Sequence, residues 1–187
     1  MLLIKKTDHV VAMSITPDTK NWTWVLERPC PECGFDTRTF PREDAGRMLR
    51  ENAQQWQRLL ADGGEVGRRP ESRVWSPLEY ACHVRDVFRI FDERLRMMLT
   101  EDDAQFANWD QDETAITERY GEQGPHQVAD EIGEAATALA DRFDSVRGDQ
   151  WTRVGLRGDG SRFTIESFAR YLMHDPIHHL HDVGLAD

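Results

Sequence analysis

Histidine is concentrated near the carboxyl end of the chain. Four of the seven histidines lie in one segment, Met-His-Asp-Pro-Ile-His-His-Leu-His-Asp at 173–182. On a helix, His174 and His178 share one face, at a separation that allows both imidazoles to bind one metal ion. His181 continues that face, whereas His179 turns away from it. The segment therefore predicts a metal site; the competing interpretation is a solvated helix end, where imidazolium also suits the helix dipole.

A catalytic metal usually needs a third protein ligand, with the remaining positions left for water or substrate. His83 is the best third ligand because it lies along the edge of the apolar stripe of another predicted helix, and bundles build metal sites between facing helices. We predict one divalent metal ion on His83, His174 and His178, with zinc first and nickel or iron as alternatives. Asp175 and Asp182 are predicted either to fix histidine tautomers or to be solvated charges.

The cysteines pose a separate question. Cys30 and Cys33 form a C-x-x-C turn, which is compatible with an ordinary tight turn, a metal knuckle or a redox pair. A structural zinc needs four ligands, and no second C-x-x-C exists; His9 could supply a third ligand and a partner subunit a fourth. A redox pair would require a strand-to-helix junction, which this part of the sequence does not show. Cys82, beside His83, is predicted to be a small core residue.

Four segments have the apolar periodicity of helices. Apolar residues recur every three or four positions at 42–62, 77–99, 125–147 and 164–183. The second segment has the most complete start signal, with Ser76 as cap, Pro77 at the first helical position and Glu79 three residues after the serine. The fourth contains Pro176, which removes one backbone donor and should kink the helix or leave the carbonyl of Leu172 free.

The connections between these segments predict the remaining organisation. Residues 1–41 form an irregular N-terminal extension, in which the Trp-Thr-Trp-Val-Leu run at 22–26 predicts a strand. The acidic segment 100–124 predicts a long loop with one short helical turn, and 151–163 a small hairpin. The sequence thus predicts an all-α fold, with a four-helix bundle over 42–187.

Composition limits the class of protein. The chain has 187 residues, enough for one core without disulfides, and 23 Lys+Arg against 34 Asp+Glu give a net charge of -11, which would repel nucleic acid. We find no signal peptide and no apolar run of the ~20 residues that a membrane span requires. Mean hydropathy is -0.66. An odd number of cysteines suits a reducing compartment, so we expect a cytoplasmic protein that acts on a small molecule, with a homodimer compatible with its apolar helices.

Three blocks of the sequence carry a resemblance to a known family. They are Trp-Ser-Pro-Leu-Glu-Tyr-x-x-His at 75–83, Asn-Trp-Asp-Gln-Asp-Glu at 108–113, and the stretch 163–183 that contains the histidines. With these blocks the chain resembles the DinB/YfiT-like superfamily of four-helix-bundle proteins. The histidine triad of that family, one residue from the second helix and an H-x-x-x-H pair from the fourth, falls on His83, His174 and His178. His179 and His181 are extra, so the ligand choice within the cluster stays open.

The resemblance also implies a chemistry. The family includes metal-dependent thiol S-transferases and mycothiol-dependent maleylpyruvate isomerases, so it implies a low-molecular-weight thiol activated as a thiolate for S-transfer to, or isomerisation of, a small electrophile. The alternatives are a metal-binding stress or interaction protein without turnover and a structural helical dimer with an incidental histidine face. Four polar residues are either cofactor contacts or, with greater weight, ion-pairing residues: Arg85, Asp110, Glu113 and Arg170.

Overall fold

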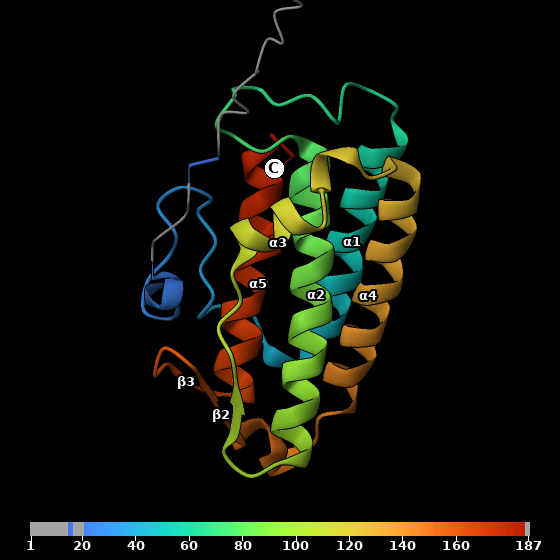
Figure 1. The fold of residues 1–187 in the computed structure, drawn as a ribbon. Helices are drawn as coiled ribbons and strands as arrows, with labels where there is room; N and C mark the ends of the chain where they lie inside the picture. Colours follow the sequence, from blue (N-terminus) through green and yellow to red (C-terminus); the bar gives the residue numbers. More distant parts are fainter. Residues whose placement is uncertain (1–14, 17–20, 186–187) are drawn as a thin grey trace, which may run out of the picture.

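Four long helices form the body of the molecule. The computed structural model describes residues 15–16 and 21–185, and its long helices are α1 (Ala45–Ala61), α2 (Pro77–Thr100), α4 (Pro125–Ser145) and α5 (Ile165–Asp182) (Figure 1). Helices α4 and α5 each pack on both α1 and α2, so α4 and α5 lie across the bundle from each other. The predicted four-helix bundle is confirmed. None of the helices in the described part of the chain is long and apolar enough to span a membrane.

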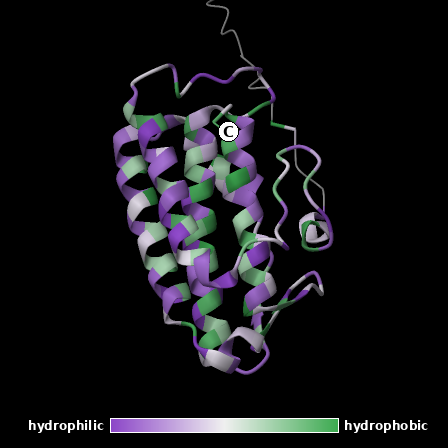
Figure 2. Cartoon of the chain, turned by 180° about the vertical axis from the view of Figure 1, so that it is seen from behind, coloured by the Kyte–Doolittle hydropathy of each residue, from purple (hydrophilic) through white to green (hydrophobic). Residues whose placement is uncertain are grey.

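Each long helix buries one apolar face in a common core. The largest side chains there have almost no exposed surface, among them Trp56 of α1, Phe88 of α2, Leu139 of α4 and Phe168 of α5. Hydrophobic and hydrophilic residues accordingly alternate around each helix (Figure 2). Cys82 is completely buried in this core, as predicted.

The two helices that carry the histidines have well-defined starts. Ser76 accepts a hydrogen bond from the backbone of Glu79 while the Glu79 carboxylate accepts one from the backbone of Ser76, the reciprocal capping box predicted for α2. Thr164 and Ser167 form an equivalent pair at the start of α5. These caps fix where both helices begin and therefore the position of each histidine along its helix.

The connections contain more structure than predicted. The hairpin is confirmed, and a further strand adds to it in parallel, giving a sheet in the order β1-β2-β3. The acidic segment holds a seven-residue α-helix and a 3-10 turn, where one short helical turn was predicted, together with that additional strand. The elements are β1 (Ala104–Phe106), α3 (Gln111–Thr117), η3 (Tyr120–Glu122), η4 (Gly148–Thr152), β2 (Val154–Arg157) and β3 (Arg162–Thr164).

The N-terminal segment, here called the arm (residues 21–41), lies alongside α5 (Figure 1). The strand predicted at 22–26 is wrong, because this run forms a 3-10 helix, η1 (Trp22–Leu26). The Asn21 side chain caps its first turn by accepting from the backbone of Thr23, and no strand pairs with it in the described residues. A second 3-10 turn, η2 (Arg42–Asp44), leads into α1. His9, considered above as a ligand, lies outside the described residues.

Candidate metal centres

Helix α5 carries two interleaved pairs of ligand-type residues. His174 and His178 are four residues apart, and so are Asp175 and His179, which lie about 100° further around the helix. The two pairs face different neighbours. His174 and His178 meet Cys30 and Cys33 of the arm, whereas Asp175 and His179 meet a histidine of α2.

We call the second set the bundle group; it consists of His83, Asp175 and His179. Its ligand atoms lie within 4.8 Å of one another. His83 Nε2 is 3.4 Å from Asp175 Oδ1, and His179 Nε2 is 3.8 Å from the same oxygen. Three ligands about 2.0–2.2 Å from one metal ion would be separated by about 3.0–3.5 Å, so small side-chain shifts would close the group on an ion.

Two of the three residues of the bundle group have buried polar atoms without a hydrogen-bond partner, and the third is oriented by a carboxylate. Asp182 Oδ2 lies 2.8 Å from His179 Nδ1, so a proton on Nδ1 would be donated to the carboxylate and Nε2 would keep its lone pair. His83 is completely buried, yet neither of its ring nitrogens has a hydrogen-bond partner, and Asp175 Oδ1 also lacks one. Because unpartnered buried polar atoms are costly, a metal ion fits this donor set.

Electrostatics favour the charged form of the carboxylate in the bundle group. Burial alone would raise the pKa of Asp175, but the nearby His83 and His179 imidazoles outweigh it and hold that pKa well below its ordinary range. Asp175 is therefore an anionic ligand near neutral pH. Two imidazoles and one carboxylate form a donor set that proteins use for catalytic zinc and non-haem iron.

Aromatic rings fix the imidazoles of the bundle group. The Trp109 ring stacks on His83 with centroids 5.3 Å apart and an interplanar angle of 9°, and Trp75 contacts the same imidazole at 5.3 Å. Tyr80 lies 4.9 Å from the ring of His179. Trp75 and Trp109 belong to two of the sequence blocks that carry the family resemblance, and this packing gives those tryptophans a role in holding a ligand.

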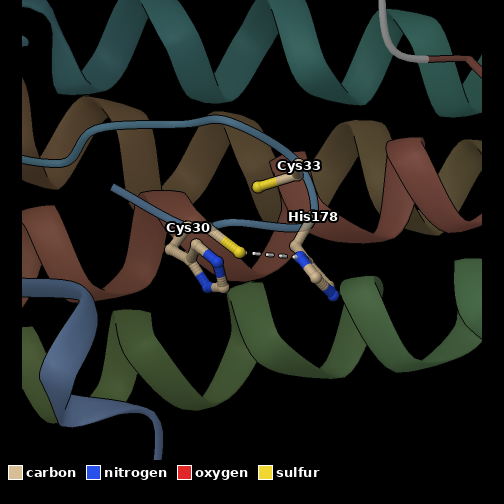
Figure 3. A group of neighbouring side chains, drawn as sticks. Cys30, Cys33 and His178 are labelled. Atoms are coloured by element: carbon tan, nitrogen blue, oxygen red, sulfur yellow. Dashed lines mark hydrogen bonds between the residues drawn. The ribbon is translucent and has the colours of Figure 1, made fainter. Parts of the chain in front are cut away.

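The other set, here called the arm group, consists of Cys30, Cys33, His174 and His178 (Figure 3 labels three of them). Its ligand atoms also lie within 4.8 Å of one another, and Cys30 Sγ is 3.7 Å from His178 Nδ1. Burial lowers the pKa of His174 to about 4 and lowers that of His178 as well, so both imidazoles are neutral near pH 7. Burial raises the pKa of the Cys33 thiol to about 11.

A cavity of about 360 Å³ opens beside both groups, between the arm, α3 and α5. Asp175 and His179 line it from the bundle, and His174 and His178 line it from the next face of α5. The remaining wall combines aromatic and polar side chains, among them Trp22, Arg73, Tyr80, Gln111 and Tyr171. A small molecule in this cavity would reach the exposed side of the bundle group.

The predicted triad of His83, His174 and His178 does not gather as one set of ligand atoms. His174 and His178 belong to the arm group, and His83 belongs to the bundle group. Whether His179 joins the site was left open by the sequence, and Asp175 was predicted either to fix a histidine tautomer or to be a solvated charge, although the spacing of these two residues matches that of His174 and His178. His181, which has a 44% exposed side chain, belongs to neither group.

Three of the four polar residues considered as cofactor contacts have other partners. Arg85 is buried and paired with Asp86 and Glu131, and Arg170 pairs with Glu166 one turn earlier. Asp110 caps α3. Arg85 and Arg170 are therefore ion-pairing residues, the role that the sequence analysis favoured, whereas Asp110 is a helix cap.

The family model of the DinB superfamily matches residues 47–183, which cover all four long helices except the first two residues of α1. The chain belongs to the DinB superfamily. Among solved structures, this chain is similar to YfiT from Bacillus subtilis, with a TM-score of 0.69 and 15% identity over 77% of this chain and 85% of YfiT. YfiT is described as a probable metal-dependent hydrolase with an unusual four-helix bundle topology. No curated protein matches the chain. The arm lies outside the matched residues.

Proposed function

We propose that this member of the DinB superfamily is a metal-dependent enzyme whose divalent ion is held by His83, Asp175 and His179. The observation that carries the proposal is the convergence of three ligand atoms, two of them on residues with unpartnered buried polar atoms, beside a cavity. With three protein ligands, a bound metal keeps positions for water or substrate and favours deprotonation of a water or thiol placed there.

The residues of the chain supply the rest of the arrangement. Asp182 holds the tautomer of His179, and Trp75 and Trp109 hold the ring of His83. Because His83 has no exposed surface, a substrate approaches from the side of Asp175 and His179, which line the cavity. Trp22 and Glu32 also line the cavity, so the arm forms part of its wall.

We further propose that the activated group is a low-molecular-weight thiol, for S-transfer to, or isomerisation of, a small electrophile. The resemblance of the sequence blocks supports this class, with mycothiol as one such thiol. A wall of aromatic rings beside arginine and glutamine side chains suits a hydroxyl-rich thiol better than an apolar one. Hydrolysis by an activated water is the second candidate, supported by the description of YfiT.

The test compares variants of one helix. Protein purified without a nickel column would be assayed for loss of an electrophile with mycothiol, with cysteine and with no thiol, as wild type, Asp175→Asn, His179→Ala and His181→Ala. His181 is the matched control because it belongs to the same cluster but to neither group. We expect thiol-dependent turnover that falls more than about 100-fold in the first two variants, beyond the loss typical of a residue that only orients a ligand, and is kept in the third.

The other outcomes separate the alternatives. Turnover of an ester or amide without thiol, lost in the same two variants, would indicate the hydrolase. Metal bound in wild type and lost in Asp175→Asn, with no turnover of either kind, would support the metal-binding protein without catalysis. Loss of metal and activity in His174→Ala and His178→Ala, but not in His179→Ala, would instead support the metal ligands predicted from the sequence, which are His83, His174 and His178.

A further inference from the structure

We propose that Cys30, Cys33, His174 and His178 form a second metal site, a closed Cys2His2 centre for zinc that fastens the arm to α5. The family match begins at residue 47, so nothing in it accounts for the two cysteines. The two metal-ligand pairs come from segments more than 140 residues apart in the sequence, and the fold brings them together. This site is independent of the bundle group, with which it shares no ligand.

The distances suit tetrahedral zinc. With Zn–S near 2.3 Å and Zn–N near 2.0–2.1 Å, neighbouring ligand atoms of a tetrahedron are separated by about 3.3–3.8 Å. Cys30 Sγ and His178 Nδ1 are 3.7 Å apart, and all four ligand atoms lie within 4.8 Å of one another. His174 Nε2 is buried without a hydrogen-bond partner, in a residue that is 3% exposed. An ion among the four ligands would complete these contacts.

The turn that carries the cysteines has the form of a metal knuckle. The backbone N–H of Gly34 donates to the Cys30 carbonyl, and the N–H of Cys30 donates to the Phe35 carbonyl, which closes the loop on itself. Gly34 has a φ of +76°, a backbone conformation that residues with a side chain rarely adopt. The turn brings both sulfurs toward the α5 histidines, with Cys30 contacting His178 (Figure 3).

The second nitrogen of His178 faces carboxylates. His178 Nε2 lies 3.5 Å from Glu32 Oε2 and 3.7 Å from Asp182 Oδ1. Because metal-binding histidines commonly direct their other nitrogen to a carboxylate, this arrangement assigns Nδ1 of His178 to the metal. Glu32 lies between the two cysteines in the sequence, so one short turn supplies two sulfurs and an orienting carboxylate.

A zinc with four protein ligands has no open position, so the site is structural. Such a link would add to a limited set of apolar contacts. Among the described arm residues, Phe40 is buried in the main hydrophobic core and Leu26 and Phe35 pack against it, whereas Val25 and Cys30 are buried outside it. Trp22 packs on both histidines, with ring centroids 5.2 Å away, and also lines the cavity. Zinc at this site would therefore hold one wall of the proposed active site.

The test counts metal and probes sulfur ligation separately. Wild type, Cys33→Ser, a Cys30→Ser/Cys33→Ser double variant, an Asp175→Asn/His179→Ala double variant and the control His181→Ala would be analysed for zinc per chain by mass spectrometry. Each would then be loaded with Co²⁺ after chelation, and the thiolate-to-cobalt charge-transfer absorption recorded. Cys33 is half-buried, so its serine variant disturbs packing least, and far-ultraviolet circular dichroism verifies folding.

We expect each cysteine variant to hold about one zinc ion per chain fewer than wild type and His181→Ala, whereas the Asp175→Asn/His179→Ala variant keeps the zinc of the arm group. The charge-transfer band would persist in the Asp175→Asn/His179→Ala variant and vanish in the double serine variant. Unchanged zinc content in the double serine variant, or no charge-transfer band in wild type, would overturn the proposal. So would a Cys30–Cys33 disulfide that re-forms after reduction in the presence of excess zinc.

Discussion

At the scale of single residues, Asp182 lies between the bundle group and the arm group. Its Oδ2 is 2.8 Å from His179 Nδ1, and its Oδ1 is 3.7 Å from His178 Nε2. Burial would raise the pKa of Asp182, but the surrounding imidazoles, His179 first, lower it overall, so the carboxylate is charged near neutral pH. One side chain therefore orients a ligand of each proposed metal, and more directly the one in the bundle group.

Replacing Asp182 should weaken the two sites unequally. In Asp182→Asn, we expect the metal affinity of the bundle group to fall about 10–100-fold, because the hydrogen bond that fixes His179 loses its charge. The arm group should change less, since its carboxylate contact is longer and Glu32 remains. Competition with a zinc chelator, followed on the Asp175→Asn/His179→Ala and double serine backgrounds, measures each affinity separately. An equal loss at both sites would contradict this assignment of roles.

The sequence predicted a metal site on α5 but did not determine which residues of this helix are its ligands. His174 and His178 have the same four-residue spacing as Asp175 and His179, and the pairs differ by about 100° of rotation. Which pair faces α2 depends on how α5 packs, and periodicity does not fix that to within one residue. The signal for the second site was present: a C-x-x-C turn lacked two ligands, and the H-x-x-x-H pair could supply both.

At the scale of elements, the start of α2 fixes the position of His83 along the helix axis. Glu79 is 5% exposed and accepts hydrogen bonds from the backbone of Ser76 and from both Nε and Nη2 of Arg69. Burial would raise the pKa of this carboxyl, but the Arg69 guanidinium and the Ser76 backbone lower it overall. The charged form of Glu79 thus stabilises the folded state.

This arrangement gives a pH-dependent stability. We expect Glu79→Gln to lower the free energy of unfolding by about 1–2 kcal/mol at pH 7, a value discounted because Arg69 is partly exposed. Because the folded-state pKa is lowered, the contribution is complete above the unfolded value of about 4.3 and is lost as the pH falls through the folded value. Urea denaturation of both proteins at several pH values would show the difference shrinking on acidification. A constant difference would argue against an ionic contribution.

Elements with a strong local signal were predicted, and those that depend on neighbours were not. Ser76 and Glu79 indicate the start of α2 in the sequence, because a capping box needs only four consecutive residues. The 22–26 run has the residue types of a strand, yet the Asn21 side chain caps a 3-10 turn there and the aromatic rings pack on α5 instead. Strand β1 was not predicted because it forms through pairing with β2, which lies some fifty residues later in the sequence.

At the scale of the whole molecule, the protein combines a bundle with a large common core and an arm that contributes few residues to that core. The core is built from all four long helices, and α1 and α4 share an extensive contact far from the arm. The arm contacts α5 through η1 and the arm group. Since local stability follows local burial, the arm should open without unfolding of the bundle once its metal is removed.

Hydrogen exchange of the amides would show this difference. On chelation, or in the Cys30→Ser/Cys33→Ser variant, we expect faster exchange in residues 21–40, while protection in the middle of α1 and α4 stays unchanged. The reason is that metal affinity contributes to the stability of the segment that it closes, and α1 and α4 do not depend on that segment. The Asp175→Asn/His179→Ala variant is the control, because its arm group is intact. Equally faster exchange in the arm and in the bundle would mean that the arm group stabilises the whole fold. Unchanged exchange in residues 21–40 would mean that contacts such as Trp22 with His174 hold the arm without a metal.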